Sequence, residues 1–118
     1  MKALRFYAPG DVRLEDVPEP TCGPREVKIK VKNCSTCGTD VKIRNNGHVN
    51  ITRVTTMGHE VAGEVVEVGA DARGGFQVGD RVQCIAAVPC GECYECIKGW
   101  MEVCQNQTSV GYQYDGGF

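Results

Sequence analysis

The sequence predicts a mainly β fold, a small antiparallel barrel or sandwich with one short helix. Apolar and polar residues alternate with a period of two over residues 26–32, which is typical of a half-buried antiparallel strand. Other short β-branched runs are separated by glycine and proline. Only residues 38–45 have helical character, with Thr39 or Asp40 available as the N-cap. Together, these patterns favour several short strands over a helical fold.

The chain is expected to begin with a β-hairpin. Residues 1–7 and 12–17 are strand candidates, joined by a turn sequence that contains Pro9 and Gly10. Prolines then break the pattern into a loop. In the strand that follows, we expect Val27, Ile29 and Val31 to face the core and the alternating lysines to face solvent.

Two more strands are predicted after the helix. Residues 61–68 and 81–87 are β-branched stretches, and a Val-Gly-Asp turn that begins at Val78 introduces the second. Residues 70–77 are expected to form a surface loop between them. With 118 residues the chain is one domain at most, small enough that a bound metal would matter for its stability.

Composition excludes several classes of partner. The formal charge of −2, from 13 basic and 15 acidic residues that are interspersed, provides no basic stripe for nucleic acid and no polybasic patch for a membrane. The first residues do not resemble a signal peptide, and no stretch is apolar enough to span a membrane. Eight cysteines without an export signal indicate reduced thiols. We therefore expect a cytoplasmic protein.

Four cysteines lie in a short Cys-x2-Cys-x2-Cys-x7-Cys string, namely Cys90, Cys93, Cys96 and Cys104. Thiolates at this spacing can converge on one tetrahedral Zn²⁺ ion. Disulfides are the alternative, but three thiols spaced by two residues cannot all pair in comfortable geometry. A closed site of four sulfurs leaves no open position for substrate. This zinc ion would therefore be structural.

A second group of candidate ligands lies upstream. Cys37, Thr39 and Asp40 belong to a Cys-Gly-Thr-Asp motif, and His59 and Glu60 follow a glycine. A metal site with three protein ligands and one position left to water polarises an oxygen atom. The alternative is a buried cysteine and a core-facing histidine, and these residues alone do not decide between the two interpretations.

The motifs in combination resemble those of the zinc-dependent medium-chain alcohol and polyol dehydrogenases, including sorbitol-like members. The Cys-Gly-Thr-Asp motif at Cys37, the Gly-His-Glu-x2-Gly-x5-Gly-x2-Ala motif at Gly58, the Val-Gly-Asp-Arg-Val motif at Val78 and the four-cysteine loop have the order and spacing of that family. The resemblance spans nearly the whole chain. It implies a GroES-like antiparallel β-barrel with a zinc-binding lobe at residues 89–105.

The resemblance also implies roles for individual residues. Cys37 and His59 match the catalytic zinc ligands, and Glu60 matches an acid that coordinates the metal in polyol-type relatives and lies just behind it in alcohol-type relatives. Asp40 matches a carboxylate that orients the histidine. Thr39 matches the hydroxyl that receives the alcohol proton, although a helix cap is its simpler role. The four cysteines of the lobe match the structural zinc ligands.

The implied reaction is the reversible oxidation of an alcohol or polyol to a ketone or aldehyde, with hydride passing to NAD or NADP in a full-length, homo-oligomeric enzyme. The sequence contains no Gly-x-Gly-x-x-Gly motif. Residues 1–118 are therefore expected to be a truncated catalytic domain that lacks the nucleotide-binding domain and is inactive alone. Lys42 also stands where many relatives have a histidine. The alternative function is a zinc-stapled β-barrel that binds or assembles without catalysis.

The remaining cysteines, histidine and tryptophan have simpler interpretations. Cys22, Cys34 and Cys84 lie in or beside strands and are expected to be small core residues. His48 is expected to be solvated in its loop. Trp100 is expected to pack beside the lobe, whereas an exposed tryptophan there would suggest an interface.

Overall fold

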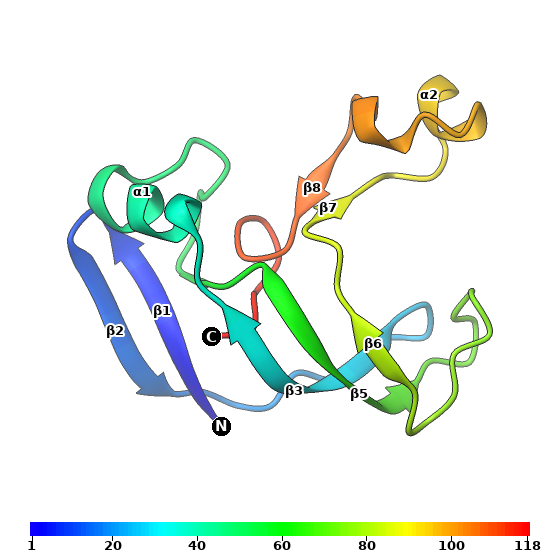
Figure 1. The fold of residues 1–118 in the computed structure, drawn as a ribbon, viewed down its shortest axis with the longest axis horizontal. Coiled ribbons are helices and arrows are strands. Elements are labelled where there is room, and N and C mark those ends of the chain that lie inside the picture. Colours follow the sequence, from blue (N-terminus) through cyan, green and yellow to red (C-terminus); the bar gives the residue numbers. More distant parts are fainter.

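The computed structural model describes residues 1–118, and it confirms a mainly β fold (Figure 1). The elements in chain order are β1 (Lys2–Ala8), β2 (Asp11–Asp16), β3 (Val27–Ser35), α1 (Gly38–Asn46), β4 (Thr55–Thr56), β5 (Glu60–Val68), β6 (Arg81–Gln83), β7 (Ala87–Val88), α2 (Tyr94–Ile97), a 3₁₀ turn (Met101–Val103) and β8 (Thr108–Ser109). No helix in the chain combines the length and apolarity that are needed to cross a membrane.

The strands form three antiparallel sheets, with strand orders β2-β1-β4, β3-β5-β6 and β7-β8. The predicted hairpin at the start is confirmed, because β1 and β2 pair from Lys2 opposite Asp16 onward. The last residues link two strand segments, since Leu4 N donates to Phe118 O at 2.9 Å and Phe118 N donates to Met57 O at 3.0 Å. The final segment therefore adds hydrogen bonds to the sheet that contains β1 and β4.

Two details of the predicted strands are wrong. The run 81–87 is not one strand, because β6 pairs with β5 and ends at Gln83, whereas β7 begins at Ala87 and pairs with β8. In β3, Val31 is 41% exposed and does not face the core. The register between β3 and β5 shifts twice, and such bulges reorient the side chains that follow.

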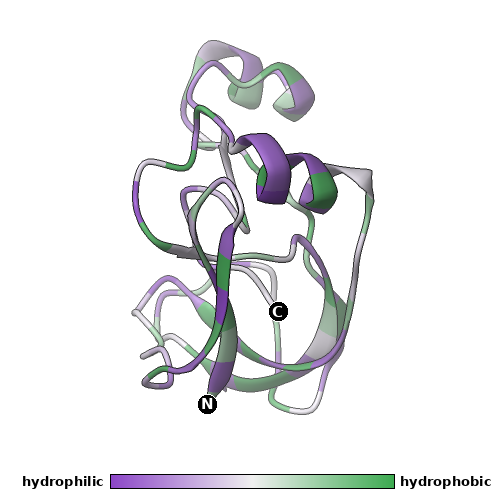
Figure 2. Ribbon diagram, turned by 90° about the vertical axis from the view of Figure 1, so that its left-hand side faces the viewer, coloured by the Kyte–Doolittle hydropathy of each residue, from purple (hydrophilic) through white to green (hydrophobic).

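The central core cluster consists of Phe6, Ile43 and Met57, which lie on β1, on α1 and immediately after β4. Figure 2 shows α1 as a mostly hydrophilic helix with few apolar positions, and Ile43 is its buried one, at 1% exposure. This side chain attaches α1 to the body of the protein. The start of the helix is thereby held close to the residues that follow β4.

Residues 88–108 form a projecting lobe that carries α2 and the 3₁₀ turn (Figure 1). The short pairing of β7 with β8 places Val88 opposite Thr108 and so closes the base of the lobe. Trp100 is 55% exposed and touches Tyr94 edge to face, with ring centroids 6.3 Å apart. Trp100 therefore packs only partly against the lobe, and its exposure fits the interface alternative.

Candidate metal centres

The four cysteines of the lobe come together at one point. Their sulfur atoms all lie within 4.8 Å of one another, with 4.0 Å between Cys90 and Cys96 and 3.9 Å between Cys93 and Cys104. A tetrahedral Zn²⁺ ion with Zn–S bonds of about 2.3 Å would separate its sulfurs by about 3.8 Å. All four are free thiols in the structure. The donor set and the spacing fit a zinc ion.

The backbone of the lobe is shaped around these sulfurs. Gly91 and Gly99 have φ values of 78° and 83°, a left-handed conformation that favours glycine. Cys93 N donates to the Cys90 sulfur at 3.4 Å, and Cys90 N donates to the Cys104 sulfur at 3.3 Å. Amide donors of this kind stabilise thiolates, which are the form that binds metal.

Different surroundings give two of these thiols different pKa values. Hydrogen bonds from the Glu92 and Cys93 amides lower the pKa of Cys90 from 9.0 to about 6. Removal from water is the largest cause that raises the pKa of Cys96 to about 12, and the neighbouring thiols raise it further. One thiolate therefore forms near neutral pH, whereas a full set of thiolates requires a cation among them.

The second centre brings Cys37 and His59 together. The Cys37 sulfur lies 3.1 Å from His59 Nε2, and the group formed by Cys37, Asp40 and His59 has its ligand atoms within 4.8 Å of one another. A tetrahedral zinc ion would separate such a sulfur and nitrogen by about 3.6 Å. Behind the imidazole, Asp40 Oδ1 lies 3.5 Å from His59 Nδ1, and these two side chains are 8% and 11% exposed.

Asp40 Oδ1 has no hydrogen-bond partner in the structure, although it is buried. A buried carboxylate oxygen without a partner is costly, and a proton on the facing His59 Nδ1 is the group placed to satisfy it. That tautomer leaves the lone pair of Nε2 directed toward the Cys37 sulfur. Metal-binding histidines commonly have this arrangement, with a carboxylate on the far ring nitrogen.

The start of α1 positions the second centre. Cys37 is the N-cap, so the expectation that Thr39 or Asp40 caps the helix is wrong. The Cys37 sulfur accepts from Thr39 N at 3.4 Å, and Asp40 Oδ2 accepts from Cys37 N at 2.9 Å, which completes a capping box. The capping contacts fix the sulfur and the carboxylate on the same side of the helix start, where both reach His59.

The other two predicted residues lie beside this group. Glu60 is the first residue of β5, is exposed and pairs with Ser35 on the backbone, and its carboxylate is not among the clustered ligand atoms. Thr39 is half-buried in the first turn of α1. The structure therefore brings Cys37, Asp40 and His59 together, with Thr39 in the same turn and Glu60 outside the group.

Tyr112 is a neighbour of the second centre that the sequence did not reveal. Its ring centroid lies 5.9 Å from that of His59 and 4.8 Å from that of His48, which is exposed as expected. Burial raises the pKa of Tyr112, as do the charges of Asp40 and Cys37. No motif marks this tyrosine. It reaches the site because the turn at Gly111, with φ of 79°, packs against the backbone at Gly58.

Comparisons with known proteins agree with this geometry. Residues 23–118 match the family model described as alcohol dehydrogenase GroES-like domain. A sorbitol dehydrogenase of Halalkalibacterium halodurans is 40% identical over 121 residues, which cover 100% of this chain and 35% of that protein. An L-threonine 3-dehydrogenase of Pyrococcus furiosus is 47% identical over 106 residues, which cover 87% of this chain and 30% of that protein.

Solved structures have the same fold. Galactitol-1-phosphate dehydrogenase from Escherichia coli matches with a TM-score of 0.86 at 31% identity, over 100% of this chain and 34% of that one. The 2R,3R-butanediol dehydrogenase from Bacillus subtilis matches with a TM-score of 0.82 at 34% identity, over 98% of this chain and 35% of that one.

The chain thus spans about a third of the length of these relatives, at 35% of the sorbitol dehydrogenase and 30% of the threonine dehydrogenase. The family match covers most of the chain and includes the second centre and the lobe. The expected resemblance and the expected GroES-like fold class are therefore confirmed, and this chain belongs to the alcohol dehydrogenase GroES-like domain family.

Proposed function

We propose that residues 1–118 are the catalytic-domain portion of a zinc-dependent, NAD(P)-linked dehydrogenase that oxidises an alcohol or polyol to a ketone or aldehyde. The observation that carries this proposal is the 3.1 Å approach of the Cys37 sulfur to His59 Nε2, with Asp40 behind the imidazole. The names of the relatives support it, because sorbitol, threonine and butanediol all carry an oxidisable hydroxyl group.

The proposal assigns two zinc ions. The four cysteines of the lobe would hold the structural ion, and Cys37 and His59 would hold the catalytic one. Glu60 is the proposed third protein ligand, because catalytic zinc sites have three and Glu60 directly follows His59. Zinc at this centre would act as a Lewis acid that makes an alkoxide accessible near neutral pH.

The residues around the second centre would then orient ligands and move a proton. Asp40 would hold a proton on His59 Nδ1 and so keep Nε2 free. The Thr39 hydroxyl is proposed to receive the proton of the substrate alcohol. Tyr112 lies beside His59 and would limit access of water to it.

The proposal includes the setting of this domain in the whole enzyme. Residues 1–118 would form part of a catalytic domain with its zinc lobe at residues 89–105. NAD or NADP would be the hydride acceptor, and no residue of this chain is assigned to bind it. The proposed enzyme is a cytoplasmic homo-oligomer that acts on a small molecule, since free thiols in this number suit a reducing compartment.

A zinc-stapled binding or assembly module without catalysis is the second candidate. The observation that favours it is the apolar surface of the lobe, where Ile97 is 74% exposed, Trp100 55% and Val103 62%. Exposed apolar residues that are grouped in this way are typical of contact surfaces. This module would require only the zinc ion of the lobe.

Metal analysis distinguishes the two functions. Protein purified without any chelator is expected to contain two zinc ions per chain. Anomalous scattering at the zinc edge should place one of them beside Cys37 and His59. Joining the chain to the nucleotide-binding half of a relative should then give NAD reduction that depends on an alcohol. A single zinc ion in the lobe, with no alcohol-dependent reduction in the joined protein, would contradict the dehydrogenase and favour the module.

A further inference from the structure

We propose that Asp115 is a positioning residue for His59. From the last segment of the chain it fixes the three residues that precede this histidine, and it thereby sets the distance between His59 and Cys37. The inference rests on the proposed second metal centre and assigns it a supporting residue outside the ligand set. Asp115 touches neither ligand.

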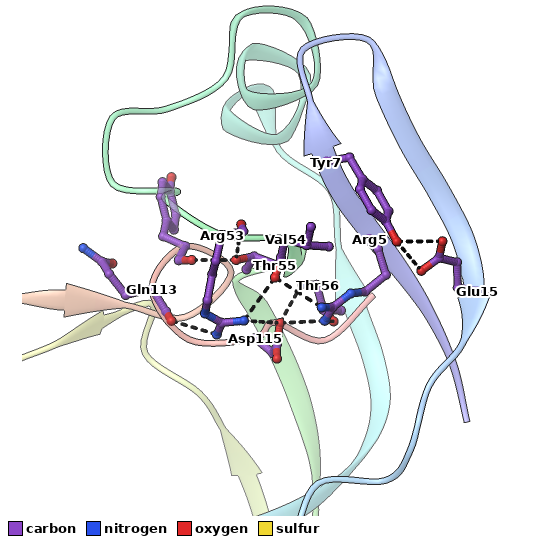
Figure 3. A network of polar contacts seen from close by, with 10 residues as sticks. Arg5, Tyr7, Glu15, Arg53, Val54, Thr55, Thr56, Gln113 and Asp115 are labelled. Carbon is purple, nitrogen blue, oxygen red and sulfur yellow. Dashed lines mark hydrogen bonds and ion pairs between the residues drawn. The ribbon is translucent and has the colours of Figure 1, made fainter.

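Asp115 is the centre of a polar network on β1, β4 and the last segment (Figure 3). Its Oδ1 atom accepts from the backbone N of Thr56 at 2.7 Å and from Arg5 Nη1 at 2.9 Å, and Arg53 Nη1 lies 3.5 Å away. Arg5 also donates to Thr56 Oγ1 at 2.9 Å and to Val54 O at 3.2 Å. One carboxylate therefore joins two arginines and the end of β4.

Backbone hydrogen bonds continue this contact as far as the residue before His59. Gly116 N donates to Thr56 O at 2.8 Å, Gly117 N donates to Gly58 O at 3.0 Å and Phe118 N donates to Met57 O at 3.0 Å. Each of residues 116–118 thus donates a backbone hydrogen bond to one of residues 56–58. The position of His59 follows directly from the position of these three residues.

Residues 115–118 and residues 56–58 pack too closely to shift along one another. A Cβ atom on Gly116 would overlap the carbonyl oxygen of Gly58, and a Cβ atom on Gly117 would lie 2.5 Å from Val61 Cγ2. Gly58 itself has a φ of 92°. Only glycine permits this approach, so the register that Asp115 sets is the one that residues 56–58 adopt.

The same residues also contact the helix that carries the other ligand. Met57 packs in the core cluster with Phe6 and Ile43, and Ile43 belongs to α1, whose N-cap is Cys37. A shift of residues 56–58 would therefore move His59 relative to the helix start. Because metal affinity depends on how closely the donor atoms converge, the effect should appear in the second centre and not in the lobe.

Magnitudes indicate which property of Asp115 matters. Its side chain is 49% exposed and that of Arg5 is 18% exposed, so the ion pair alone is weakened by solvent. The hydrogen bond to the Thr56 amide is partly buried and sets backbone geometry. Asp115→Ala removes this acceptor, whereas Asp115→Asn retains a carbonyl oxygen in its place. The alanine variant should therefore be the more severe.

The test uses the 118-residue chain with zinc in the lobe and Co²⁺ titrated into the second centre. The visible absorption of Co²⁺ reports its ligand geometry, which a general loss of stability does not change. We expect Asp115→Ala to weaken Co²⁺ binding by about tenfold and to change this spectrum, with Asp115→Asn between it and the unsubstituted chain. Zinc affinity of the lobe should stay unchanged in both, which also shows that each variant is folded.

Asp16→Ala is the matched control, because Asp16 makes only an exposed contact, 3.1 Å from Lys2 Nζ, on β2. It should leave both centres unchanged. If Asp115→Ala does not fold, Asp115→Asn and Arg5→Gln still test the inference, and each should weaken Co²⁺ binding by about threefold. The positioning role would be overturned if the folded Asp115 variants bound Co²⁺ with normal affinity and spectrum. If the unsubstituted chain still held two metal ions, the second centre itself would stand. Only one metal ion in the unsubstituted chain would overturn the second centre and the proposed function.

Discussion

Asp40 connects the first turn of α1 to His59 through two different oxygen atoms. Its Oδ2 atom accepts from the Cys37 amide at 2.9 Å, and its Oδ1 atom faces His59 Nδ1 at 3.5 Å. One buried carboxylate therefore orients both candidate ligands. The helix cap and the metal centre share this residue, so a substitution must be chosen to affect one role and spare the other.

Asp40→Asn should separate the two roles. The asparagine oxygen can still accept from the Cys37 amide, so the helix start should remain intact. Its NH₂ group would face His59 Nδ1 and favour the tautomer that carries the proton on Nε2. A protonated Nε2 has no lone pair with which to bind the metal. We expect the affinity of the second centre for zinc to fall by about tenfold, with little change in the free energy of unfolding. The tautomer is measurable by ¹⁵N NMR of the imidazole, and a proton that remained on Nδ1 would contradict the assigned role of Asp40.

Cys96→Ser should remove the zinc ion of the lobe and leave the second centre occupied. Serine is a poor zinc ligand, and a four-sulfur site that has lost one thiolate loses most of its affinity. Elemental analysis should fall from two zinc ions per chain to one. Cys22→Ser is the control, because the Cys22 thiol contacts only backbone carbonyls, the nearest being that of Glu26 at 3.4 Å, and a serine hydroxyl can also donate to a carbonyl. Loss of both ions in Cys96→Ser would show that the centres are not independent.

Glu60→Gln tests the third ligand. If Glu60 binds the metal, loss of its charge should weaken binding at the second centre by about tenfold, because an amide oxygen is a much poorer zinc ligand than a carboxylate. Glu67→Gln makes the same change at another exposed position of β5 and should have no effect. Equal affinities of the two variants, measured by competition with a zinc chelator, would exclude Glu60 from the ligand set.

The sequence predicted the parts of this molecule that local chemistry determines. Alternation predicted β3, a turn sequence predicted the hairpin, and cap candidates at residues 39 and 40 indicated α1. The cysteine spacing predicted a cluster of four thiols, and their sulfurs do lie within 4.8 Å of one another. It did not predict that Val31 is exposed, because bulges depend on the partner strand. Tyr112 was also missed, since its approach to His59 depends on packing between a turn at Gly111 and a distant glycine.

Tyr112 should make the stability of the metal-free chain fall at high pH. Burial, followed by the charges of Asp40 and Cys37, raises the pKa of this phenol above 10.0 in the folded state. Its contribution is then fully present below pH 10 and is lost as the pH rises through the folded-state pKa, because the unfolded chain ionises first. Urea unfolding at pH 8 and pH 11 should show a smaller loss in Tyr112→Phe. Tyr114→Phe, at a 52% exposed position, should behave like the unsubstituted chain.

Substitutions of Cys37 should reveal that its sulfur has two functions. Both Cys37→Ser and Cys37→Ala should abolish metal binding at the second centre, because each removes the thiolate that faces His59 Nε2. Their stabilities should differ, since serine is a strong N-cap and alanine is not. The alanine variant should unfold with a free energy lower by about 1 kcal/mol, measured by urea denaturation of the metal-free chains. Equal stabilities of the two variants would show that a side-chain cap at position 37 does not stabilise the helix, contrary to the capping role assigned to this position.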